Sequence, residues 1–109
     1  MSSYSRGEVV LVRYPFSDLS GSKIRPAVVI NTPHPSQDLL ILPLTSKTKS
    51  LLAGEFILKG WNQAGLNVET AVKRGIYTIH QNLIVRRVGR LTDSDLNGLD
   101  QALRQWLGL

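Results

Sequence analysis

Residues 21–30, GSKIRPAVVI, place a turn directly before a β-strand. The glycine and serine at the start favour a turn, and the valine and isoleucine run that follows favours an extended strand over residues 26–31. Because proline lacks the N–H that a strand ladder uses, we expect Pro26 at the first strand position. Arg25 precedes this proline, which biases its backbone toward extended geometry. The stretch therefore predicts a strand with an arginine held directly before its first residue.

Short strands of the same kind recur along the chain. Runs of apolar and β-branched residues between turn formers predict further strands over residues 8–14, 39–44, 54–59, 69–79 and 83–91. Pro43 indicates an edge position or a bulge near the end of its strand. The connection between the first two strands is longer than usual, which favours a functional loop.

The last part of the chain changes to a helical period. Apolar residues at helical spacings share one face: Leu96, Leu99, Ala102, Leu103, Trp106 and Leu107. Thr92 or Asp93 would cap the start and Gly108 would end the helix, which predicts a helix over about residues 93–107. Six short strands and one amphipathic helix predict a mainly β (α+β) fold, a small curled antiparallel barrel on which the helix docks.

Length and composition predict one domain over residues 1–109, with 42% hydrophobic residues and enough apolar surface for a single core. Cysteine is absent, which excludes a disulfide framework, a thiolate metal site and a cysteine nucleophile. The chain has no apolar run long enough to span a membrane, and its N-terminus lacks the apolar segment of a secretory signal. We therefore expect a cytoplasmic protein.

The charge balance favours an anionic partner. Thirteen Lys and Arg residues stand against eight Asp and Glu, for a net charge of +5 and a pI of about 10.0. Nucleic acid or an acidic protein segment would suit such a surface. A merely basic domain has the same totals, so the positions of the charges must decide.

Most catalytic and metal-binding templates are missing from the sequence. Neither His34 nor His80 stands in an HxxxH or HExxH setting, and no Walker loop, GxGxxG, GxSxG or RNA-binding aromatic signature occurs. We interpret His34 as a solvated loop residue, and His80 as structural with a site role left open. The sequence therefore predicts neither a metal site nor a cofactor.

Two residues have the chemistry to bind a phosphate. The planar guanidinium of Arg25 suits phosphate oxygens, and Thr45 follows a strand and opens a basic loop that contains Lys47 and Lys49. Each residue alone is more often a solvated arginine or a turn threonine. A shared phosphate site is therefore a hypothesis that needs support from the rest of the chain.

A family resemblance favours that hypothesis. The ordered fragments GEVVLVRYPF, KIRPAVVI, ILPLTSK and LIVRRVGRL before TDSDL resemble the MazF/PemK family of toxin endoribonucleases, over about residues 6–107. The resemblance implies an SH3-like barrel, a homodimer, metal-independent cleavage of single-stranded RNA, and neutralisation by a cognate antitoxin. It also implies that Arg25 and Thr45 are the catalytic residues, and that Gly7 and Glu8 are the structural opening pair.

Two departures from the family pattern concern the site. Some members carry an Arg-x-Asp pair near the position of Lys73 and Arg74, and this stretch of the chain has no aspartate. The GSKIRP loop also lacks the acidic residue that often follows the loop glycine. The identity of a general base is therefore left open between His80, Glu69 and water.

The predicted reaction is attack of an RNA 2′-OH on the adjacent phosphate, which leaves a 2′,3′-cyclic phosphate. A guanidinium is a poor base at neutral pH, so we assign Arg25 to charge stabilisation and Thr45 to a neutral donor. The expected substrate-binding residues are Lys23, Ser46, Lys47, Lys49, Trp61, Lys73 and Arg74. Trp61 would either stack a base or form a half-buried contact, whereas the helix register places Trp106 in the core or at a dimer contact.

The predicted partners are single-stranded RNA, messenger RNA above all, and an acidic, partly disordered antitoxin that orders over Arg25 and Thr45. Any operator DNA would be bound through the antitoxin complex. Two alternatives stay open. The same barrel could bind nucleic acid or protein without chemistry, or it could be a topoisomerase poison that acts through its C-terminal helix.

Overall fold

The computed structural model describes residues 4–14, 23–31 and 38–109. Three features named in the sequence analysis lie outside the described residues: His34, the predicted turn at residues 21–22 and the predicted loop before it. The elements are strands β1 (Glu8–Tyr14), β2 (Lys23–Val29), β3 (Asp38–Thr45), β4 (Phe56–Ile57), β5 (Ala71–Val72), β6 (Tyr77–His80), the 3₁₀ helix η1 (Gln81–Leu83), β7 (Ile84–Arg90) and α1 (Asp93–Leu107). The predicted mainly β fold with a C-terminal helix is confirmed.

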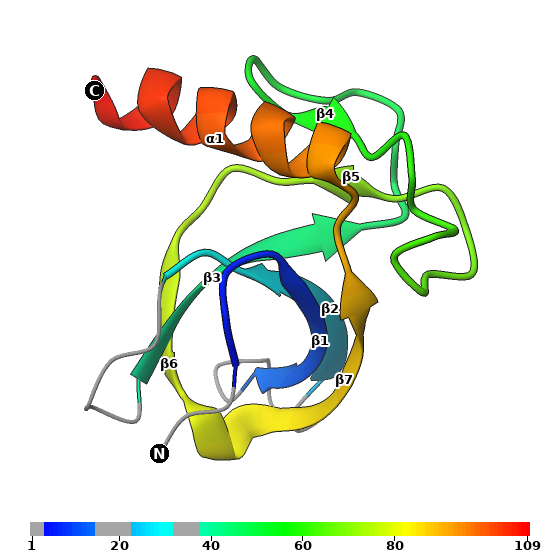
Figure 1. The fold of residues 1–109 in the computed structure, drawn as a ribbon, viewed down its shortest axis with the longest axis vertical. Helices are drawn as coiled ribbons and strands as arrows, with labels where there is room; N and C mark the ends of the chain where they lie inside the picture. The colour runs from blue at the N-terminus through cyan, green and yellow to red at the C-terminus, as the bar shows by residue number, and fades with distance from the viewer. Residues whose placement is uncertain (1–3, 15–22, 32–37) are drawn as a thin grey trace.

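The strands form one strongly curled antiparallel sheet in the order β4-β5-β3-β2-β1-β7, with β6 paired to β3 beside β5. Figure 1 shows β1, β2, β3, β6 and β7 curving around a common interior, while α1 lies across one end of this barrel. Among the described residues no pairing joins β7 to β4 or β6, so the ring is barrel-like without being closed by hydrogen bonds.

Parts of the three central strands are buried on both faces, and this explains their apolar sequences. Alternating residues such as Val10 and Val12 on β1 point into the barrel, where they pack with Ile41 of β3. Val9 points to the other face, against Leu99 of α1. A strand covered on both sides reads as a continuous apolar run, which is why residues 8–12 are so rich in valine.

The helix begins and ends where the sequence predicts. The Thr92 hydroxyl accepts a hydrogen bond from the backbone N–H of Asp95 at 3.2 Å, and Gly108 closes the helix with φ 71°. Asp95 is 3% exposed, and its carboxylate accepts from the backbone N–H groups of Lys59 and Gly60 at 2.9 and 2.8 Å. The first turn of α1 therefore holds the loop that follows β4.

The second strand begins earlier than predicted. It starts at Lys23, so Arg25 lies inside β2, opposite Val12 of β1, and Pro26 is not its first residue. The proline is accommodated because β2 pairs with β3 only from Ala27 onward. The arginine is thus held by a strand that is paired with β1.

Pro43 is not at a sheet edge, because β3 has partners on both sides. One side pairs with β2, while the other pairs first with β6 and then, at Leu44 and Thr45, with β5. Pro43 stands where the partner changes, and its carbonyl accepts from the N–H of Lys73 at 3.0 Å. The missing N–H therefore falls at a gap in the ladder.

Two predicted strands are shorter in the structure. The stretch 54–59 contributes only Phe56–Ile57, and 69–79 is divided into β5 and β6 with a break over residues 73–76. The break has a physical cause, since the chain must pass from one part of β3 to another across Pro43. Gly75, with φ 145°, provides the backbone conformation for that passage.

Candidate active site

An open cleft of about 540 Å³ lies where β2 and β3 face the chain segment that leads into β5. It is lined by Tyr14, Arg25, Pro26, Pro43, Leu44, Thr45, Ser46, Lys47, Leu66, Asn67, Val68, Thr70 and Lys73. The cleft thus combines an apolar floor with hydroxyl groups and three cations. That combination suits a ligand with flat apolar parts and a negative backbone.

Arg25 presents its guanidinium to this cleft from the exposed part of β2. The guanidinium makes no hydrogen bond or ion pair with any other residue that the structure describes. Its planar donors are therefore available to an incoming anion. Position by a paired strand keeps the direction of the side chain within a narrow range.

Thr45 lies at the end of β3, opposite Ala71 of β5, and is half-buried. Its hydroxyl oxygen accepts from the backbone N–H of Lys47 at 3.0 Å. A hydroxyl group has one proton to donate besides its acceptor positions. The bond to Lys47 therefore fixes the oxygen at the cleft and leaves the proton for a ligand.

The structure brings some of the other predicted residues to the cleft and leaves others outside its lining. Ser46, Lys47 and Lys73 line it together with Arg25 and Thr45. Four more predicted residues do not line it, namely Lys23, Lys49, Trp61 and Arg74. The three cations among these four are exposed, whereas Trp61 packs against the core cluster beneath α1.

Tyr14, Asn67, Val68 and Thr70 also line the cleft and were not predicted from the sequence. Tyr14 continues the inward face of β1 and is 8% exposed, so the period of two along that strand was the signal available for it. Burial raises the pKa of Tyr14 to about 12, with a further contribution from Tyr77. Tyr14 is therefore a neutral phenol at physiological pH and not a base.

The candidates for a general base differ in position. His80 pairs with Asp38 at the opposite end of β3 from Thr45, about 23 Å along the strand at the usual rise per residue. Its Nδ1 accepts from the N–H of Asn82 at 3.1 Å and caps η1. Glu69 is exposed and adjoins Thr70, but it does not itself line the cleft, and its carboxylate accepts from the hydroxyl of Thr48 at 2.8 Å. The position of His80 far from Thr45, and its bond to Asn82, therefore indicate a structural role.

A carboxylate does reach the Lys73–Arg74 stretch, from a distant part of the sequence. The side chain of Glu55 accepts from the backbone N–H of Arg74 at 2.9 Å. The sequence carries no signal that links Glu55 to this stretch, because the contact depends on the pairing of β4 with β5.

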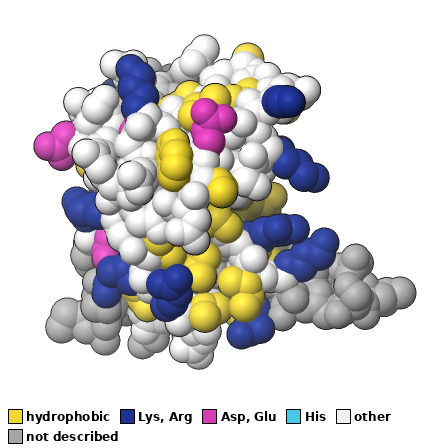
Figure 2. All heavy atoms as spheres, turned by 90° about the vertical axis from the view of Figure 1, so that its right-hand side faces the viewer, with side chains coloured by type: hydrophobic (Ala, Val, Ile, Leu, Met, Phe, Trp, Pro, Cys, Tyr) yellow, Lys and Arg dark blue, Asp and Glu magenta, His cyan; other side chains and the backbone are white. Residues whose placement is uncertain are grey.

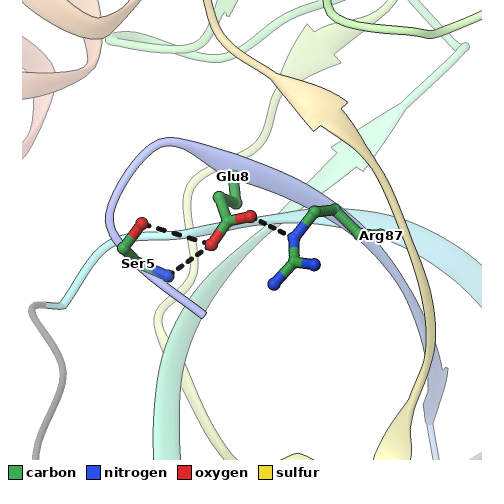
Figure 3. Close-up of polar contacts among 3 residues, drawn as sticks. All are labelled: Ser5, Glu8 and Arg87. Carbon is green, nitrogen blue, oxygen red and sulfur yellow. Dashed lines mark hydrogen bonds and ion pairs between the residues drawn. The ribbon is translucent and has the colours of Figure 1, made fainter. Parts of the chain in front are cut away.

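Glu8 has a structural role at the start of β1, as the family resemblance implies. Its carboxylate accepts from the backbone N–H of Ser5 at 2.6 Å and from the Ser5 hydroxyl at 3.2 Å, and it forms an ion pair with Arg87 (Figure 3). The Arg87 guanidinium also lies 4.8 Å from the ring centre of Tyr4. Arg87 thus ties β7 to the start of β1, and both Arg87 and the neighbouring Arg86 are exposed.

The surface carries its charge in a pattern suited to a polyanion. On the face drawn in Figure 2, Lys and Arg side chains flank exposed hydrophobic side chains and are more widespread than Asp and Glu. In the part of the chain that the structure describes, no three His, Asp or Glu side chains gather in a metal-binding group. None of the described helices has the length and apolar character needed to cross a membrane.

The fold and the cleft define a class of protein, a small, basic, barrel-like β fold with one docked helix and an open cleft lined by three cations. The sequence itself matches the family model described as PemK-like, MazF-like toxin of type II toxin-antitoxin system, over residues 5–107. The chain therefore belongs to this toxin family. A comparison with curated protein sequences finds no significant match.

Solved structures of similar fold carry related names. A Deinococcus radiodurans MazE–MazF structure has a TM-score of 0.79 at 15% identity, covering 99% of each chain. An endoribonuclease in complex with its cognate antitoxin, from a mycobacterial species, has a TM-score of 0.77 at 17% identity, covering 100% of this chain and 97% of that one. The Mycobacterium tuberculosis toxin MazF-mt6 has a TM-score of 0.73 at 20% identity, covering 94% and 97%. These likenesses extend over the whole fold.

Proposed function

We propose that this chain is an endoribonuclease that cleaves single-stranded RNA, messenger RNA above all, and acts as the toxin of a toxin–antitoxin pair. The observation that carries the proposal is the placement of Arg25 and Thr45 in one open cleft with Lys47 and Lys73. Membership of the toxin family supports it, as do the endoribonuclease names of two structural neighbours.

The proposed reaction is an internal transfer of the phosphodiester. The 2′-oxygen bonds to phosphorus, the bond from phosphorus to the 5′-oxygen breaks, and the proton of the 2′-OH is balanced by protonation of the leaving oxygen. The products are a 2′,3′-cyclic phosphate and a 5′-hydroxyl. No metal ion is required where the protein supplies the charge stabilisation itself.

Arg25 would stabilise the additional negative charge on the phosphate oxygens in the transition state, and Thr45 would donate a neutral hydrogen bond. Donors placed in advance of the reaction are worth much more in a cleft than in water, because no reorganisation is needed. Lys47 and Lys73 would hold the flanking phosphates, and the apolar floor formed by Leu66 and Val68 would receive a base. Because His80 lies at the opposite end of β3, the general base would be water or Glu69, which adjoins Thr70.

The proposed partners follow from the same surface. An acidic antitoxin segment that orders in the cleft would cover Arg25 and Thr45 and exclude RNA. We infer a cytoplasmic location, where both RNA and antitoxin are present. The homodimer implied by the resemblance is part of this proposal. A groove of about 370 Å³ beside the end of α1, with Leu107 and Leu109 exposed, offers apolar surface for such a contact.

The test uses labelled single-stranded RNA in EDTA with the parent protein, Arg25→Ala and, as a control, Lys59→Ala. Lys59 is an exposed cation that does not line the cleft. We expect the parent and Lys59→Ala to cleave, and Arg25→Ala to lose about 100- to 1000-fold in rate, as expected when a well-placed donor is removed. The products should carry a cyclic phosphate.

Binding of RNA by the parent without cleavage, across varied sequences, would contradict an enzyme and favour a binding module. Growth arrest separates the remaining alternative. If Arg25→Ala arrests growth as strongly as the parent, the protein acts by another route, such as a topoisomerase poison.

A further inference from the structure

The chain leaves the sheet after β5, at a point where β3 offers no further hydrogen-bond partner. The backbone N–H of Lys73 donates to the carbonyl of Pro43, and Pro43 has no N–H to offer in return. The N–H of the next residue, Arg74, would be left without a strand partner. Arg74 is exposed, so water could satisfy that donor, but a bond to water would not tie the segment to the rest of the fold.

The carboxylate of Glu55 takes the place of that missing partner. One of its oxygens accepts from the N–H of Arg74 at 2.9 Å, and the other accepts from the N–H of Leu52 at 2.8 Å. The backbone N–H of Glu55 in turn donates to the carbonyl of Leu52 at 3.0 Å. Glu55 therefore ties the turn at residues 52–55 to the segment that follows β5.

The turn on the other side of this connection is itself fixed. Gly54 has φ 86°, and a Cβ there would collide with the indole ring of Trp106. Trp106 packs against the core cluster beneath α1. Movement of the turn is thus limited by α1, and Glu55 transmits that restraint to residues 73 and 74.

Lys73 is the cleft cation that this restraint controls. It lines the cleft with Arg25 and Thr45, and its backbone lies between the bond to Pro43 and the bond made by Glu55. We propose that Glu55 is a positioning residue that holds the Lys73 segment so that the ammonium group meets an RNA phosphate in the cleft. The proposal rests on the proposed ribonuclease function.

The charge state of Glu55 agrees with this geometry. Burial by itself raises the pKa of Glu55, but the N–H bonds from Arg74 and Leu52 and the ammonium of Lys73 outweigh it, and the net effect is a pKa below the ordinary value. The carboxylate is therefore ionised at neutral pH. An ionised oxygen makes the stronger hydrogen bonds to backbone N–H groups that a restraint of this kind needs.

A positioning role of Glu55 and a purely electrostatic effect of its charge predict opposite changes in RNA binding for Glu55→Gln. Removal of a negative charge beside a basic cleft should tighten RNA binding by electrostatics alone. Loss of the restraint should instead raise KM for cleavage roughly three- to tenfold, the scale of one lysine–phosphate contact. The change in kcat should be smaller, because Lys73 binds a flanking phosphate and not the reacting one.

The experiment measures kcat and KM on a single-stranded RNA oligonucleotide for Glu55→Gln, Lys73→Met and the double variant. If Glu55 acts through Lys73, Glu55→Gln should change KM less than about twofold in the Lys73→Met background. Asp93→Asn is the control for the loss of one negative charge, because Asp93 is an exposed carboxylate at the start of α1 and does not line the cleft. Glu55→Asp keeps the charge and shortens the reach, so it too should raise KM.

Three results would overturn the inference: tighter RNA binding by Glu55→Gln, the same KM effect of that substitution in both backgrounds, or an unchanged KM in Glu55→Asp. Thermal unfolding of each variant shows whether it is folded. If Glu55→Gln does not fold, the KM of Glu55→Asp decides whether the inference holds.

Arg25→Ala is assayed in parallel to separate this inference from the proposed function. If the parent cleaves, Arg25→Ala does not, and the Glu55 variants match the parent, only the positioning role fails. If the parent neither binds nor cleaves RNA, both proposals fail.

Discussion

The hydroxyl of Thr45 has two roles, one in the structure of the loop and one in the cleft, and substitutions at this single residue can test them. The oxygen accepts from the backbone N–H of Lys47, so removal of the hydroxyl affects both the loop and the cleft. Serine keeps the hydroxyl and loses only a methyl group, whereas valine keeps the shape and loses the hydroxyl. The pair therefore separates hydrogen bonding from packing at Thr45.

We expect Thr45→Ser to retain RNA cleavage within a few-fold of the parent, and Thr45→Val to lose about 100- to 1000-fold in kcat, as for removal of a well-placed donor. The loop bond to Lys47 is worth about 1 kcal/mol, so Thr45→Val should unfold slightly earlier and stay folded at 25 °C. Single-turnover cleavage and thermal unfolding are the measurements. Equal activity of the two variants would remove Thr45 from the mechanism.

The residues of the site were predictable to the extent that their chemistry is visible locally. Arg25 and Thr45 have the chemistry to bind a phosphate, but the family resemblance was needed to single them out, and both lie in the cleft. Asn67 and Glu55 carry no local signal, because their places depend on β4 and β5, which pair only through contacts distant in sequence. The distance of His80 from Thr45 likewise follows only from the register of β3 with β6, so the sequence left open whether His80 is the general base.

At the scale of elements, the first turn of α1 acts as an anchor for the loop that follows β4. Asp95 is buried and accepts two backbone N–H bonds from that loop, and a buried acceptor that loses its charge leaves at least one donor poorly satisfied. We expect Asp95→Asn to lower the free energy of unfolding by about 2 kcal/mol. Urea unfolding checks this value.

Asp93→Asn provides the comparison on the same turn of α1. Asp93 is exposed, and its charge contributes only through the helix dipole, so its loss should cost less than about 1 kcal/mol. Similar losses in the two variants would mean that Asp95 also acts through the dipole and that the loop is held by other contacts.

The elements differ in how well the sequence predicted them, and the cause is the range of the interactions involved. The bounds of α1 follow from local caps and a helical period, and they match over residues 93–107. The strands over residues 54–59 and 69–79 were predicted too long, because apolar composition cannot show where a ladder partner ends. The ladder between β3 and β5 ends at Pro43, and Gly75 turns the chain toward β6, the other strand that pairs with β3.

At the scale of the whole molecule, the net charge of +5 predicts RNA affinity that falls with salt, and the positions of the lysines predict how steeply. Each phosphate contact on a single strand contributes about 0.7 to the slope of log K against log salt concentration. Lys47→Ala and Lys73→Ala, in the cleft, should each lower the slope by about that amount. Lys59→Ala, outside the cleft, should leave it unchanged.

The same titration tests how far RNA extends beyond the cleft. Lys23, Lys49 and Arg74 are exposed but do not line it, so a strand confined to the cleft would not feel their loss. RNA long enough to follow the basic surface should lose about 0.7 of slope for each of these cations that it meets, whereas a two- or three-nucleotide RNA should lose none. Binding is measured with non-cleavable deoxy analogues of both lengths at several salt concentrations. Equal slopes for parent and variants on the long analogue would confine the substrate to the cleft, and the predicted binding roles of Lys23, Lys49 and Arg74 would be wrong.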